Sequence, residues 1–134
     1  MAFSDTHSKV TAGIDALRAQ MDHACRAGLN ELATALFADN PDIGSVYWTQ
    51  HFDPTVGFSL GSIHYTTVHV INARLYADQG NSSLVLFATF LRSIAYHLFC
   101  VHGGNVQITL SASGLQSAPI QAELIKARPN CKCS

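Results

Sequence analysis

Apolar residues recur at steps of three and four near the start of the chain. This spacing follows the period of a helix with one apolar stripe, so we predict a long helix, or a pair of helices, over residues 6–38. Gly28 and Asn30 mark where a break would fall, because glycine suits a helix C-terminus and asparagine a new N-cap. We expect the stripe to face the core. It consists of Val10, Ile14, Leu17, Met21, Cys25, Leu29, Leu32 and Leu36.

Two segments rich in aromatic and β-branched residues follow, over residues 45–52 and 58–71. They flank a turn at residues 53–57, so we predict a β-hairpin. Gly61 within the second strand marks a bulge or a close approach of the backbone. A turn centred on Thr55 fixes the register, because alternate side chains of a strand share one face. This register places His64 on the core face. The expected pairs are Phe52 with Phe58, Gln50 with Leu60, Trp48 with Ser62, and Val46 with His64.

A very apolar segment, residues 82–100, predicts the central helix of the fold. Asn81, Ser82 and Ser83 offer an N-cap, and a pair of glycines at residues 103–104 ends the helix. Apolar side chains lie nearly all round it, which is typical of a helix covered on several sides. They exceed what a small sheet can cover, so we predict that part of this helix forms a homodimer interface. The expected interface residues are Leu84, Phe87, Phe90, Leu91, Ile94 and Leu98.

The remaining elements complete an α+β fold. Clean alternation over residues 105–111 predicts a strand with one solvated face. Pro119 begins and Pro129 ends a short predicted helix at residues 119–128, and we expect a flexible tail at about residues 129–134. We therefore predict a single domain spanning residues 1–134. Its small antiparallel sheet, a hairpin plus one further strand, is packed by a long N-terminal helix, the apolar central helix and the short C-terminal helix.

Composition narrows the classes of function. Of the 134 residues, 48% are hydrophobic and only 13% charged, which excludes a disordered chain and suggests a surface that self-associates. The net charge of -1 comes without a cationic stripe, so we expect no nucleic-acid partner. The first residues lack a secretory signal, and we expect a cytoplasmic location. The apolar run at residues 84–101 contains Arg92, whose charge costs about 3 kcal/mol in a membrane, so a buried helix is expected rather than a span.

The densest group of candidate ligands is His97, Cys100 and His102. Zinc needs three or four such ligands converging tetrahedrally, and a fourth is available from Cys131 or Cys133. The spacing is not that of a standard zinc signature. The other interpretation is a buried cysteine with histidines placed favourably near a helix C-terminus. Both interpretations remain open, and zinc is the one cofactor that the sequence suggests.

No nucleophilic triad or phosphate-binding loop is indicated by the sequence. We therefore predict a non-enzymatic binding or inhibitory protein that acts as a homo-oligomer, as small phage inhibitors, anti-defence proteins and toxin-immunity proteins do. The run at residues 47–50, followed by Phe58 and Ser59, is similar to a layout in uncharacterised small phage-encoded proteins. That resemblance implies no residue roles. The alternative prediction is a small histidine-dependent enzyme, or a domain that binds a metal or another ligand.

Overall fold

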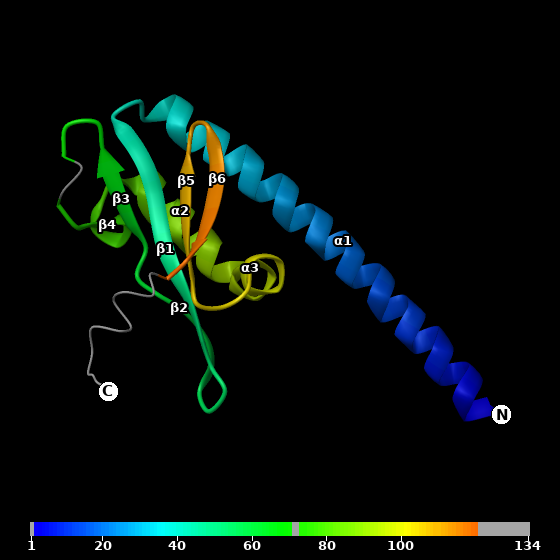
Figure 1. Cartoon of the computed structure of the whole chain (residues 1–134). Helices are drawn as coiled ribbons and strands as arrows, with labels where there is room; N and C mark the ends of the chain where they lie inside the picture. The colour runs from blue at the N-terminus through cyan, green and yellow to red at the C-terminus, as the bar shows by residue number, and fades with distance from the viewer. Residues whose placement is uncertain (1, 71–72, 121–134) are drawn as a thin grey trace, which may run out of the picture.

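The computed structural model describes residues 2–70 and 73–120. A long N-terminal helix is followed by a β-sheet whose strands are interrupted by two further helices (Figure 1). In chain order the elements are α1 (Ala2–Asp39), β1 (Ile43–Asp53), β2 (Gly57–Leu60), β3 (His64–Thr67), β4 (Leu75–Tyr76), the 3-10 helix η1 (Ala77–Gln79), α2 (Ser82–Ser93), α3 (Ala95–His102), β5 (Val106–Ser111) and β6 (Gly114–Pro119).

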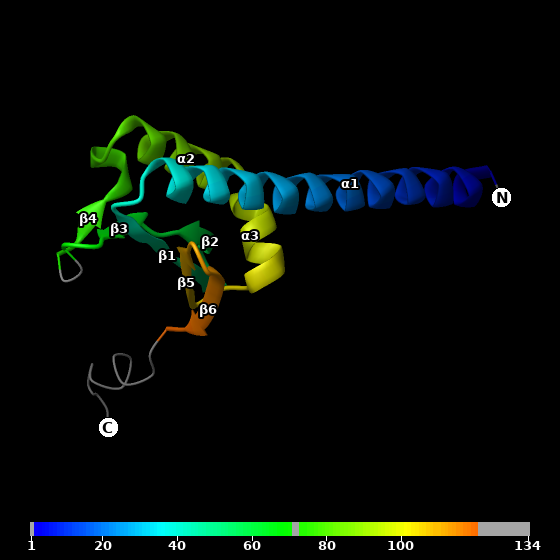
Figure 2. The same cartoon turned by 90° about the horizontal axis from the view of Figure 1, so that it is seen from above.

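The sheet has six antiparallel strands in the order β4-β3-β1-β5-β6, and β2 pairs with the far end of β1. The helices lie on one face of it (Figure 2). The core forms between the two layers, where Val46, Trp48 and Ile108 from the strands meet Leu91 and Leu98 from the helices. The α+β class is thus confirmed. The sheet is larger than the predicted three strands, and the order of the helices also differs from the prediction.

Helix α1 is continuous, so the long-helix alternative holds and no break occurs at Gly28. It ends at Asp39, and the next residue, Asn40, caps it: the backbone and side-chain nitrogens of Asn40 both donate to the carbonyl oxygen of Leu36, at 3.0 and 2.8 Å. Only its last turns pack on the sheet, where Ala33 and Leu36 are buried. Before these turns, α1 contacts α2 at Gly28 and α3 at Asp22. The part that precedes Asp22 extends away from the sheet, α2 and α3, which together form the body of the molecule (Figures 1 and 2). The expectation that its whole apolar stripe faces the core is therefore wrong.

The predicted hairpin is correct near its turn and shifted beyond it. Phe52 pairs with Phe58 and Gln50 with Leu60, as expected. At Gly61 the chain leaves the ladder: its backbone nitrogen donates to the carbonyl of Thr49 at 2.8 Å, and a Cβ there would clash with the Thr49 hydroxyl. When the strand resumes as β3, the register has slipped. Val46 pairs with Tyr65 and Tyr47 pairs with His64.

This slip of register reverses the predicted position of His64. Because successive side chains of a strand point to opposite faces, a shift of one residue moves His64 from the core face to the open face. Ile63, in the irregular stretch between β2 and β3, is buried instead. The close backbone approach that Gly61 was expected to mark is confirmed, and it lies where the register changes between β2 and β3.

The central helix is two helices rather than one. Asn81 is the N-cap of α2, and its side chain accepts a hydrogen bond from the nitrogen of Leu84 at 2.9 Å. At Ile94 the axis bends by 67° into α3. No single helix among the described residues is long and apolar enough to cross a membrane; α2 and α3 meet that criterion only when they are taken together as a bent pair.

The C-terminal part of the sheet differs from the prediction. Strand β5 is confirmed, but it is followed by β6, which pairs with it along its whole length from Ser111 and Gly114 to Val106 and Pro119. Pro119 therefore ends a strand and does not begin a helix. The remainder of the predicted helix and the predicted tail at residues 129–134 lie outside the described residues.

Candidate functional site

The structure brings two of the three candidate zinc ligands, His97 and His102, to one cleft and leaves Cys100 outside it. His97 faces α1, and its Nδ1 lies 3.1 Å from Oδ1 of Asp22. His102 lines a cleft beside it, whereas Cys100 is exposed and does not line that cleft. Among the described residues, no three His, Cys, Asp or Glu side chains come together in a group that could hold a metal ion. Cys131 and Cys133, the expected source of a fourth ligand, lie outside those residues.

The cleft beside His102 lies between α1, α3 and the β5–β6 hairpin, and has a volume of about 600 Å³. Asp22 of α1 links the two helices through its contact with His97 of α3, and it also pairs with Arg26 of its own helix at 2.9 Å. Burial lowers the pKa of His102, and the nearby positive charges of His97 and Arg26 lower it further. Apolar side chains form much of the remaining wall: Leu29, Ala33, Phe37, Leu98, Leu110 and Leu115.

This arrangement links α1 to α3 through the side chain of Asp22. The Asp22 carboxylate contacts Arg26 through Oδ2 and the ring of His97 through Oδ1. Burial chiefly, and then the charges of His97 and Arg26, disfavour the protonated form of His102 and so lower its pKa. The cleft thus has an apolar wall with a polar rim, a lining that is typical of sites for small molecules.

Gln50 is a buried polar residue that sequence reasoning did not single out. Its side chain is fully buried beneath α3. Its Oε1 accepts from Nε1 of Trp48 at 3.1 Å, and its Nε2 donates to the carbonyls of Leu98 and Gly103 at 3.2 and 2.8 Å. Because every polar group of this amide has a partner, Gln50 anchors the C-terminal end of α3 to the sheet. The signal in the sequence was a polar residue two positions from Trp48 on the predicted core face.

The predicted interface residues pack within their own chain. Leu84, Phe87, Leu91, Ile94 and Leu98 are all buried in the core. Phe90 is half-buried and lies against Gly28 of α1, where a Cβ would come within 3.4 Å of its ring. The six-stranded sheet and α1 cover this apolar surface, so little of it remains for a second subunit.

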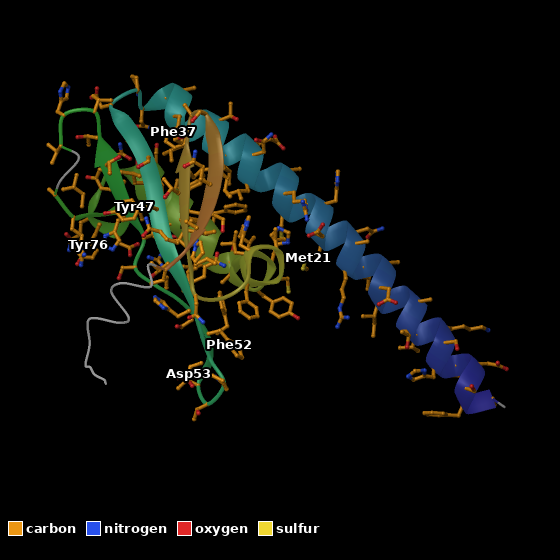
Figure 3. All side chains as sticks on the ribbon, viewed as in Figure 1. Met21, Phe37, Tyr47, Phe52, Asp53 and Tyr76 are labelled. Atoms are coloured by element: carbon orange, nitrogen blue, oxygen red, sulfur yellow. The ribbon has the colours of Figure 1, made fainter. Side chains whose placement is uncertain are left out.

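The largest uncovered run of apolar side chains lies instead on the projecting part of α1. The run ends at Met21, where α1 passes α3 (Figure 3). We call its five residues, Phe3, Val10, Ile14, Leu17 and Met21, the α1 stripe. Their exposed fractions are 81% for Phe3, 55% for Val10, 44% for Ile14, 65% for Leu17 and 67% for Met21.

Comparison of the chain with protein-family models, with curated proteins and with solved structures finds no match.

Proposed function

We propose that this protein is a non-enzymatic binding or inhibitory protein that works as a homodimer, in which two copies of α1 pair through the α1 stripe. The observation that carries the proposal is the exposure of five large apolar side chains in a row on a helix that projects from the body. Soluble monomers rarely leave such a continuous apolar surface uncovered. The low charged fraction of the chain, 13%, further favours association with proteins.

The spacing of the α1 stripe identifies the kind of partner that fits it. With His7 included, the residues follow one another at alternating steps of four and three, from Phe3 to Met21. The pattern is a heptad repeat, in which apolar positions recur on average every 3.5 residues. It is the pattern by which two α-helices wind round each other in a coiled coil. A second helix with the same spacing is therefore the matching surface. A second copy of α1 provides it.

An antiparallel pairing covers the α1 stripe most evenly. With the two-fold axis at the level of Ala12, each stripe residue faces another stripe residue or His7. The two bodies then lie at opposite ends of the pair and do not compete for space. A parallel pairing in register would instead place His7 against His7 and bring the bodies together. The antiparallel layers are Phe3 with Met21, His7 with Leu17, and Val10 with Ile14.

Pairing would also stabilise the helix itself. The projecting part of α1 lacks the tertiary contacts that stabilise most helices in proteins, and an isolated helix of this length is marginal in water. Burial of ten half-exposed apolar side chains contributes on the order of 10 kcal/mol. This is comparable with the cost of bringing two chains together, so we expect a reversible dimer whose population depends on concentration.

Light scattering of the full chain tests the dimer. We expect a mass twice that of one chain at about 100 μM and a shift towards the monomer on dilution. The double variant Ile14→Asp with Leu17→Asp should be monomeric and less helical by circular dichroism, because it places charges in the seam. The matched control, Ala12→Asp with Ala19→Asp, adds the same charges on the opposite face of α1 and should remain dimeric.

Two results would overturn this proposal. One is a native chain that remains a monomer throughout this concentration range, and the other is equal dimerisation by both double variants. The orientation is tested by mixing Val10→Cys and Ile14→Cys chains under oxidising conditions. Antiparallel helices cross-link the unlike chains to each other, whereas parallel helices cross-link like chains.

A further inference from the structure

The open face of the sheet contains a second hollow, which is separate from the cleft and from the α1 stripe. Its volume is about 390 Å³, and it lies over β1, β3 and β4 with an edge on β5. Tyr47 and Tyr76 mark its position (Figure 3). We call it the sheet hollow. The lining residues that matter for its chemistry are Tyr47, Thr49, His51, His64, Arg74 and Tyr76.

Three aromatic rings form a row across this hollow. Tyr47, His64 and Tyr76 are direct partners on neighbouring strands, so their side chains share one face. The His64 ring stacks on Tyr47 with 5.2 Å between centroids and lies tilted against Tyr76 at 4.7 Å. The row offers planar surface with hydroxyl groups at its margins, which suits the flat body of a small ligand.

His64 has an unsatisfied polar atom in this row. Its Nδ1 is buried and has no hydrogen-bond partner among the described residues. Burial lowers the pKa of His64, the charge of Arg74 lowers it further, and a hydrogen bond with the backbone of Leu75 acts in the opposite direction. Buried polar atoms are rarely left without a partner, so each exception calls for an explanation. An anion bound beside the ring would offset the charge of Arg74.

Arg74 supplies the only full positive charge among the lining residues, and no carboxylate lines the hollow. Of the four arginines among the described residues, Arg26 pairs with Asp22 and Arg92 pairs with Asp78, whereas Arg18 on the projecting helix has no ion pair. Arg74 has no ion pair with any residue that the structure describes. An unpaired guanidinium beside a concave aromatic surface is well suited to bind a carboxylate or phosphate.

From these observations we propose that the sheet hollow binds a small organic anion, with its carboxylate or phosphate held by Arg74 and its planar body against Tyr47 and Tyr76. His64 lies between the two tyrosines and senses the charge of the ligand. This inference does not rest on the proposed dimer, because the hollow is formed within one chain. Monomeric variants of α1 should bind the same ligand.

Nuclear magnetic resonance titration with benzoate tests the site, because benzoate carries a carboxylate on a flat ring. Saturable shifts are expected at His64, Arg74 and the two tyrosines, together with a rise in the pKa of His64 as benzoate binds. Benzyl alcohol, which has a similar shape without the charge, should bind at least about tenfold more weakly. Inorganic phosphate is the second probe. Competition by phosphate would extend the site to phosphates, and its absence would restrict the site to planar carboxylates.

A charge-removing variant isolates the role of Arg74. Arg74→Gln should weaken benzoate binding by about fivefold or more, whereas Arg18→Gln, which removes a charge from the exposed part of α1, should not change it. Arg74 is exposed, so its replacement should leave the fold intact. Equal binding of benzoate and benzyl alcohol, equal binding by Arg74→Gln and the native chain, or shifts confined to other residues would each overturn the proposal.

Discussion

Helix α1 contains two regions with the same sequence pattern and different surroundings. In the second half of the helix Cys25, Leu29 and Leu36 lie against the body, and Leu36 is almost completely buried, although Leu32 is 42% exposed. From Phe3 to Met21 the apolar side chains have the same three- and four-residue spacing, yet they are exposed. The pattern therefore shows that a helix has an apolar face. It does not show whether that face is covered by the same chain or by another.

The difference between the two regions is tested most directly by replacing one leucine with alanine in each. Leu36→Ala should lower the free energy of unfolding by about 2–4 kcal/mol, because it leaves a cavity in the core. Leu17→Ala should change it by less than about 0.5 kcal/mol in dilute solution, where the chain is a monomer. Urea denaturation measures both variants. Similar losses for the two variants would mean that the projecting part of α1 packs on the body after all.

Two glycines, one in the sheet and one on the projecting helix, distinguish the same regions by smaller changes in stability. Gly61→Ala should destabilise the chain by about 1–3 kcal/mol, because its Cβ clashes with Thr49, whose hydroxyl is already bonded to His51 at 2.8 Å. Gly13 on the projecting helix has no atom within 4 Å of an added Cβ. Gly13→Ala should therefore stabilise α1 by about 0.5–1 kcal/mol. Thermal unfolding followed by circular dichroism compares them, and a neutral Gly61→Ala would contradict the packing at the register slip.

Acid should lower the free energy of unfolding because of two histidines, His64 and His102. The folded-state pKa values of His64 and His102 lie below the ordinary value of 6.5, so on acidification the unfolded chain takes up protons first. Stability should consequently fall as the pH drops below about 6.5 and level off below the folded-state pKa values. His64→Asn and His102→Asn should each flatten this profile when the unfolding midpoint is measured from pH 7.5 to about 5. Three profiles of equal slope would contradict this assignment.

The sequence predicted the elements best where local chemistry determines them. The turn at Asp53 to Gly57 set the nearby hairpin pairs correctly, and Asn81 was recognised as a cap. The slip after Gly61 depends on a contact with Thr49 on the neighbouring strand, which no periodicity reveals. The bend at Ile94 occurs without proline or glycine, so the apolar run predicts one continuous helix. These two features depend on tertiary packing.

The candidate sites were harder to predict for the same reason. His97 and His102 are close in sequence, but what surrounds them, Asp22 and Arg26, comes from a distant part of α1. Strand β6 has a single strongly apolar residue, Leu115, and therefore gives almost no strand signal. The sheet hollow needs β3 and β4 in their actual register to place His64 beside Tyr76. That register could not be derived while the slip at Gly61 was unknown.

The position of β1 has a consequence for how the protein is made. This strand lies between β3 and β5, so the sheet cannot be completed until Val106 and the residues after it have been synthesised. The hydrogen bonds of α1 are local, and α1 is synthesised before every strand of the sheet. Two nascent chains on one messenger RNA could thus pair through α1 before either sheet is complete. We expect co-translational assembly to favour partners translated from the same message.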